Sequence, residues 1–90
     1  MATTDINAVW SRIETNAGAR FLTKTGLPFI YEVPGNYLLV DRANRSLSKT
    51  NFRKALEVMP VDGPGGIKDR QGSAYTWAIL MDNRIRRDDW

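Results

Sequence analysis

The sequence lacks cysteine and histidine, and both absences narrow the chemistry available to the protein. Without cysteine there is no disulfide bond, no thiolate nucleophile and no thiolate metal ligand. Without histidine, the most frequent general base and metal ligand are missing, together with every Ser-His-Asp or Cys-His catalytic arrangement. We therefore expect a protein that is not an enzyme and that holds no metal and no cofactor.

Long hydrophobic runs are also missing, as is the pattern of a secretory signal. No stretch reaches the roughly 18–20 apolar residues that span a bilayer, and the start, MATTDINAV, has no basic segment followed by an apolar run. The sequence therefore predicts a cytoplasmic protein with no membrane partner. Its 90 residues, 42% apolar and 26% charged, fit one small domain over 1–90.

The acidic residues do not indicate a catalytic centre either. A metal-dependent nuclease needs two or three carboxylates close together beside a lysine, and the acids of this chain are scattered over predicted strand, linker and loop. They include Glu32, Asp41, Asp62 and Asp69.

The glycine-rich stretch GPGGIKDRQG, residues 63–72, invites a phosphate-cradle interpretation. It lacks the Gly-Lys-Ser/Thr ending of a P-loop, and it follows a predicted helix, whereas a P-loop follows a strand. We interpret it as a connecting loop. From this loop, Lys68 and Arg70 are still able to reach a ligand bound elsewhere.

Three segments carry the apolar spacing of helices. The first covers about residues 5–16 and stops at Gly18, the second starts at the N-cap Ser48 and stops before Pro60, and the third starts at Ser73 with AYTWAILMD. Apolar residues at i, i+3, i+4 and i+7 form the predicted buried face of the first two helices. These residues are Ile6, Val9, Trp10 and Ile13, and Phe52, Ala55, Leu56 and Met59.

Three short β-rich segments, 19–25, 29–33 and 37–40, lie between the first two helices and are separated by the turn-forming TGLP and VPGN. They predict an antiparallel β-meander. A turn that pairs Val33 with Asn36 directs alternate side chains to opposite faces. The face toward the helices then carries Phe29, Tyr31, Leu38 and Val40, and the outer face carries Ile30, Glu32, Tyr37 and Leu39.

The expected fold is therefore α+β, with a three-stranded antiparallel β-meander packed against three helices in the order α-β-β-β-α-loop-α. The chain closes with NRIRRDDW, which predicts a short charged tail over about residues 83–90. Trp90 at its end is a candidate for exposure.

Residues 40–54, VDRANRSLSKTNFRK, hold five cations and a single acid, Asp41, at the edge. Part of this stretch lies at the start of the second predicted helix, where free backbone N–H groups favour anions. We predict a small module that binds DNA or RNA by neutralising phosphates, although the same pattern occurs on the solvated face of an ordinary amphipathic helix. The phosphate-binding candidates are Arg42, Arg45, Lys49, Arg53 and Lys54, with Asn44 and Asn51 to orient the contact.

The order helix, three strands, helix over roughly residues 5–59 resembles the double-stranded RNA-binding domain, a family with a basic cluster at the start of its last helix. In SLSKTNFRKAL the matching cations are Lys49, Arg53 and Lys54, and the resemblance implies that they contact phosphates across the duplex groove. The chain departs from the family at TGLP, which replaces a Gly-Pro-x-His loop, and at residues 50–51, which interrupt a run of lysines. The segments RANRSLSKTNFRKALEVMP and SAYTWAILMDNRI also resemble small uncharacterised bacterial proteins. This second resemblance implies a bacterial source, but it does not indicate any particular activity.

A protein partner or a second copy of the chain is the alternative. The apolar outer face of the predicted sheet and the terminal tryptophan would form that interface, and ARFLT is an uncovered edge strand in the expected meander. The interface candidates are Ile30, Tyr37, Leu39 and Trp90. Nucleic-acid binding should weaken steeply with salt, whereas a protein interface should tolerate salt better.

Overall fold

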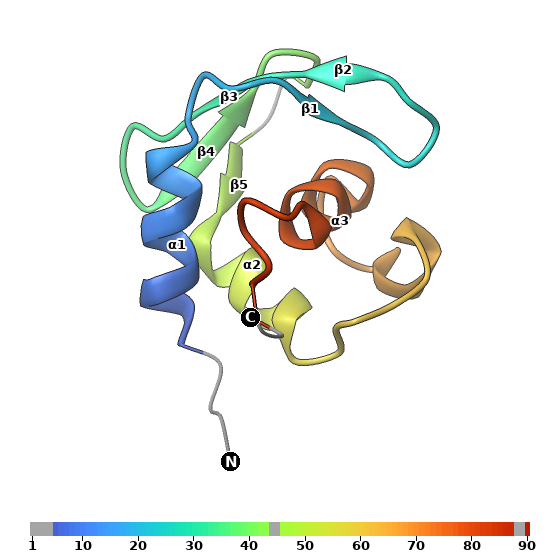
Figure 1. Ribbon diagram of the computed structural model, residues 1–90. Coiled ribbons are helices and arrows are strands. Elements are labelled where there is room, and N and C mark those ends of the chain that lie inside the picture. The colour runs from blue at the N-terminus through green and yellow to red at the C-terminus, as the bar shows by residue number, and fades with distance from the viewer. Residues whose placement is uncertain (1–4, 44–45, 88–89) are drawn as a thin grey trace.

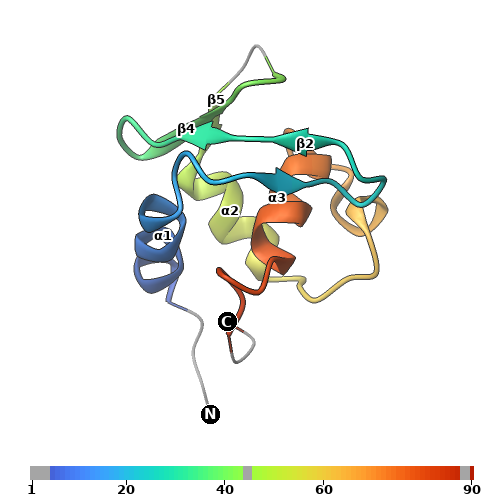
Figure 2. The ribbon, with the colours of Figure 1, turned by 45° about the horizontal axis from the view of Figure 1, so that its top comes forward.

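The computed structural model describes residues 5–43, 46–87 and 90, which form a β layer with three α-helices on one side of it (Figure 1 and Figure 2). The helices are α1, Ile6–Thr15, α2, Lys49–Leu56, and α3, Ser73–Met81, with a short 3-10 helix η1, Pro64–Ile67. The strands are β1, Phe21–Leu22, β2, Pro28–Phe29, β3, Tyr31–Glu32, β4, Tyr37–Val40, and β5, Ser46–Ser48. This is the expected α+β class with a three-stranded antiparallel sheet. Over these described ranges, no helix combines the length and the apolar character needed to cross a membrane.

The β layer consists of two small antiparallel sheets, β1–β2 and β3–β4–β5. The segment 28–32 belongs to both, because its first part pairs with β1 and its second part pairs with β4. The predicted pairing of segment 19–25 with 29–33, and of 29–33 with 37–40, is confirmed, but it is divided between two sheets. The prediction missed one further strand, β5, which pairs with β4 and completes the three-stranded sheet. Strand β5 has three residues, too few for a period of two to distinguish it from the linker around it.

The register between β3 and β4 differs from the predicted one by two residues. Tyr31 lies opposite Val40, whereas pairing Val33 with Asn36 would have put Tyr31 opposite Leu38. Because side chains alternate with a period of two, an even shift leaves every residue on its predicted face. The inner residues Phe29, Tyr31, Leu38 and Val40 are accordingly buried, and the outer residues Ile30, Tyr37 and Leu39 are exposed.

The starts of α2 and α3 use different capping chemistry. At α2 the predicted cap is confirmed, because Ser48 Oγ accepts a hydrogen bond from the backbone N–H of Asn51 at 3.0 Å. At α3 the predicted cap Ser73 is wrong, and the N-cap is Gly72 with φ of +57°. A Cβ atom on Gly72 would lie 2.7 Å from Leu47 Cδ2 in β5. Glycine therefore permits both the left-handed backbone and the close approach of α3 to the sheet.

The core lies between the β layer and the helices, and it includes two residues from segments that the sequence predicts to be peripheral. Ile67, in the glycine-rich loop, and Ile85, in the predicted tail, are both fully buried. Trp90 is partly buried, and its indole N–H donates to the carbonyl oxygen of Leu80 at 2.7 Å. The expected exposure of Trp90 is therefore not found, and the charged C-terminal segment contributes Ile85 to the core. Burying one isoleucine side chain contributes about 1.5–3 kcal/mol, and the flanking charges stay at the surface.

Candidate nucleic-acid interface

The basic segment 40–54 does not form one surface, because the β4–β5 hairpin separates its two ends. Arg42 follows β4 and donates from Nε to the carbonyl oxygen of Pro28 at 2.6 Å. Lys49 lies at the other end of the hairpin, where its backbone N–H donates to the carbonyl oxygen of Asn36 at 2.8 Å. Two of the predicted residues, Asn44 and Arg45, lie outside the described residues. Arg42 and Lys49 are therefore too far apart along the hairpin to act together, contrary to what was expected of the five cations.

Asn51 is a structural residue and not a surface donor. Its side chain is 8% exposed, and Nδ2 donates to the carbonyl oxygen of Gln71 at 3.1 Å and to Thr76 Oγ1 at 3.2 Å. The prediction that Asn51 orients a nucleic acid is therefore wrong. The reason is the helical period, since Asn51 lies beside Phe52 on the face of α2 that packs inside the domain.

Lys49, Arg53 and Lys54 carry their charges on the outer side of α2. Lys49 Nζ donates to Asn7 Oδ1 of α1 at 2.7 Å, an interaction that leaves its charge uncompensated. Arg53 forms a 3.2 Å ion pair with Glu57, and exposed pairs of this kind contribute little to stability. Within the described ranges, Lys54 has neither a hydrogen-bond partner nor an ion-pair partner. All three cations are therefore available to an anion.

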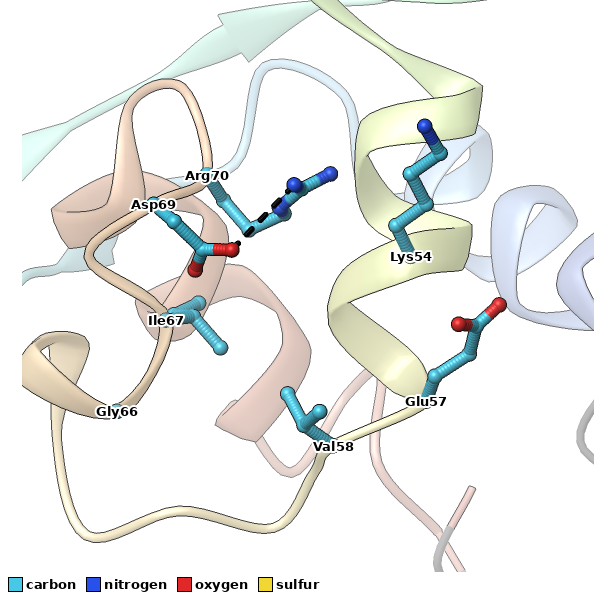
Figure 3. A pocket seen from close by; sticks show the side chains of 7 residues that line it. All are labelled: Lys54, Glu57, Val58, Gly66, Ile67, Asp69 and Arg70. Carbon is cyan, nitrogen blue, oxygen red and sulfur yellow. Dashed lines mark hydrogen bonds and ion pairs between the residues drawn. The ribbon is translucent and has the colours of Figure 1, made fainter.

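Two further cations, Lys68 and Arg70, lie in the loop before α3, and Arg70 lines a pocket together with Lys54. A pocket of about 480 Å³ lies between the C-terminal end of α2 and segment 66–70 (Figure 3). Lys54 lines it from the helix and Arg70 from the loop, and Lys68 is exposed on the same segment. The sequence showed that Lys68 and Arg70 occupy a loop, but a loop has no periodicity from which its position against α2 could be read.

We call Lys49, Arg53, Lys54, Lys68 and Arg70 the basic surface. With Glu57 and Asp69 beside them, five cations face two acids, an excess of three positive charges. The whole chain has 13 cations and 10 acids, which is also an excess of three. These seven residues therefore carry a local excess of positive charge as large as the formal net charge of the whole chain.

The groups with shifted pKa values stabilise the fold and lie outside the basic surface. Arg84 Nε and Nη2 donate to the two carboxylate oxygens of Asp82 at 2.8 and 2.9 Å, and this hydrogen bonding lowers the pKa of Asp82 and raises that of Arg84. Nη2 of Arg84 also donates to the carbonyl oxygen of Arg20 at 2.9 Å, which ties the C-terminal segment to the start of β1. Burial raises the pKa of Tyr31, whose hydroxyl donates to the carbonyl oxygen of Ile13 at 2.7 Å. Across the described residues, no three acids gather in a way that would hold a metal ion.

The outer face of the β layer is the second candidate interface. All three helices lie on the opposite side of the layer (Figure 2), and Ile30, Tyr37 and Leu39 are 39–41% exposed. The exposed Leu22 and Leu27 of the β1–β2 hairpin add to the apolar surface of the layer. Trp90, the fourth predicted interface residue, does not join them, because it packs against α3.

Comparison with known proteins gives no further guide to the function: no family model, no curated protein and no solved structure matches the chain.

Proposed function

We propose that the protein is a non-enzymatic module that binds nucleic acid by contacting backbone phosphates with the basic surface. The observation that carries the proposal is that Lys54 of α2 and Arg70 of the loop before α3 line one pocket, while Lys49 and Arg53 lie on the same helix as Lys54. Phosphate contacts are the main sequence-independent source of affinity for DNA and RNA. The proposal therefore predicts binding that depends on charge and on salt more than on base sequence.

The contacts of the individual cations support the same proposal. A phosphate that replaces Glu57 as the partner of Arg53 displaces only a weak, solvent-exposed ion pair. Lys54 gains a partner without losing one. In addition, Lys49 and Arg53 are four residues apart on α2, where like charges repel, and an anion bound between them relieves that repulsion.

Fluorescence anisotropy with labelled mixed-sequence single strands and duplexes, across a series of salt concentrations, tests the proposal. The variant Arg53→Gln/Lys54→Gln removes two charges from the basic surface, and the matched control Arg42→Gln/Lys24→Gln removes two charges elsewhere. The first variant should lower the affinity by at least about tenfold and reduce the salt slope by about 1.4–1.8, from 0.7–0.9 per lost contact. The control should change the affinity by less than about threefold, the long-range effect of net charge alone.

Equal losses in the two double variants would mean that the protein attracts nucleic acid by its overall charge and has no binding surface. Absence of binding at low salt would refute nucleic-acid binding directly.

A second candidate function, binding of another protein or a second copy of the chain, is favoured by the exposed apolar side chains of the β layer. Large exposed apolar patches are uncommon on soluble monomers and frequently mark interaction sites. Sedimentation velocity over a wide range of concentrations should then reveal self-association that Leu39→Lys abolishes and that added salt does not weaken. Sedimentation as a monomer at every concentration would rule out the second copy as the partner.

A further inference from the structure

We propose that the pocket between α2 and segment 66–70 holds one nucleotide unit of a single strand, with its phosphate between Lys54 and Arg70 and its base against Val58. This inference rests on the proposed function and adds the class of nucleic acid. In Figure 3 the side chain of Arg70 extends from the loop toward α2, and Val58 and Ile67 point into the space between the loop and the helix.

The guanidinium group of Arg70 can donate further hydrogen bonds to a ligand in this pocket. A guanidinium group carries five N–H donors, and among the described residues its partner is Asp69, at a long 3.5 Å. The Arg70 side chain is nevertheless only 26% exposed, so water has limited access to it. A phosphate offers several acceptor oxygens and forms short, strong hydrogen bonds with a guanidinium group. Lys54, which has no partner among the residues that the structure describes, supplies the second charge from across the pocket.

The separation between Lys54 and Arg70 is held by a buried hydrogen bond. Asn51, one helical turn before Lys54, donates to the carbonyl oxygen of Gln71, the residue after Arg70. Asn51 also bonds Thr76 of α3, so helix and loop are tied at the same point. A site whose two cations are positioned before the ligand arrives avoids part of the entropy cost of binding.

The apolar part of the pocket fits a base. Val58 is 55% exposed, and the other large apolar side chains with high exposure belong to the β layer or the turns between its strands. Bases removed from a stack are commonly seated against apolar or aromatic side chains. The volume of about 480 Å³ lies within the roughly 300–1,000 Å³ of small-molecule sites. The carboxylates of Glu57 and Asp69 at the rim are suited to accept hydrogen bonds from the amino group of a base.

The strand type follows from this geometry. In a duplex the bases are stacked and paired, and seating one against Val58 requires its extrusion, which costs free energy. A single strand offers unstacked bases at much lower cost. The protein should therefore bind a single strand more tightly than a duplex with the same number of phosphates.

The test compares Val58→Ser with the control Leu22→Ser in the β layer. Val58 and Leu22 are both apolar and both 55% exposed. Val58→Ser should lower single-strand affinity by about fivefold, which corresponds to roughly 40 Å² of apolar surface covered by the base at about 25 cal/mol per Å², and leave duplex affinity within about twofold. Leu22→Ser should change neither. Arg70→Gln should lower single-strand affinity by more than Val58→Ser does. Circular dichroism should show that each variant is folded.

Cytidine monophosphate, ribose 5-phosphate and inorganic phosphate, titrated as competitors of the labelled single strand, separate the parts of the site. Cytidine monophosphate should compete best, because it alone supplies both base and phosphate. If Val58→Ser leaves single-strand affinity unchanged while Arg53→Gln/Lys54→Gln lowers it, the pocket assignment is refuted and the proposed function stands. If no strand binds but cytidine monophosphate does, with dependence on Val58 and Arg70, the pocket takes a free nucleotide and the proposed function fails. If none of these ligands binds, both are refuted.

Discussion

Replacing Asn51 by alanine should destabilise the protein and leave its affinity for duplex nucleic acid unchanged. The substitution removes the hydrogen bonds of Asn51 Nδ2 to the carbonyl oxygen of Gln71, 3.1 Å, and to Thr76 Oγ1, 3.2 Å. Each contributes a net ~0.5–1.5 kcal/mol. The carbonyl of Gln71 keeps a hydrogen bond from Thr76 at 3.2 Å, so it is not left unpaired. The free energy of unfolding should therefore fall by about 1–3 kcal/mol.

The assay is urea unfolding followed by tryptophan fluorescence, because the chain has three tryptophans as probes. A loss of 1 kcal/mol lowers the melting temperature of a domain this size by about 4–8 °C, so the thermal midpoint should fall by roughly 4–24 °C. The m value should not change, since the same surface is exposed on unfolding. Thr50→Ala is the control, because Thr50 is exposed on the same helix turn and alanine is a better helix former.

The result that would refute this reasoning is an Asn51→Ala protein of unchanged stability with weakened duplex binding. The Asn51 amide would then face the ligand, and the buried hydrogen bonds that fix the loop against α2 would be wrong. A loss of stability with unchanged duplex affinity would instead separate the structural role of Asn51 from the phosphate contacts of its neighbours on the helix.

Three further substitutions test the packing of the domain. Gly72→Ala should lower the free energy of unfolding by about 1–3 kcal/mol, because the φ of Gly72 is +57° and a Cβ there would lie 2.7 Å from a β5 leucine side chain. Thermal melts measure this loss. In the same melts the control Gly65→Ala should be nearly neutral, because a Cβ at Gly65 would meet nothing within 4 Å. Tyr31→Phe should cost about 0.5–1.5 kcal/mol in urea unfolding, the usual net value of one hydrogen bond. The Ile13 carbonyl loses its 2.7 Å donor but keeps a 3.2 Å hydrogen bond from the backbone N–H of Asn16. Asp82→Asn should flatten the acid limb of the profile of unfolding free energy against pH. The hydrogen bond from Arg84 lowers the pKa of Asp82 in the folded state. The stabilisation by this pair is therefore present above the ordinary aspartate pKa of 3.8 and is lost as the pH falls below that value. An equally steep acid limb in Asp82→Asn would show that other carboxylates control acid unfolding.

The helices and the buried faces were accessible from the sequence because they depend on local periodicity. The spacing of Val9, Trp10 and Ile13 predicts the buried side of α1, and all three are buried. The alternation in FIYEV and YLLV assigns the correct faces even though the register differs by two residues. The strand β5 and its pairing with β4 could not be predicted in this way. β5 is a three-residue strand inside a basic segment, and pairing between distant segments leaves no periodic trace in so short a run.

The candidate site shows the corresponding limit for function. Cations adjacent in the sequence were expected to act together, but the β4–β5 hairpin carries Arg42 away from Lys49. Arg70, which follows α2 by a long loop, instead lies beside Lys54. Sequence adjacency predicts spatial adjacency within one helix, where residues four apart are neighbours. Across a hairpin or a loop, only the tertiary contacts decide which charges meet.

The short length of α2 connects the stability of the fold to the proposed binding. A helix of eight residues that carries three cations is not stable alone, so its order comes from packing of its inner side, where Phe52 and Ala55 are fully buried. In the loop that carries Arg70, Ile67 is fully buried, and the Asn51–Gln71 hydrogen bond links the loop directly to α2. Without the hydrogen bond, Arg70 would have to be ordered when the ligand binds, and the affinity would fall by that entropy cost. Asn51→Ala should therefore weaken single-strand binding even at temperatures where the variant is folded. Duplex binding should stay within about twofold, because Arg70 is one of five cations of the basic surface and the apolar part of the pocket takes no part in it.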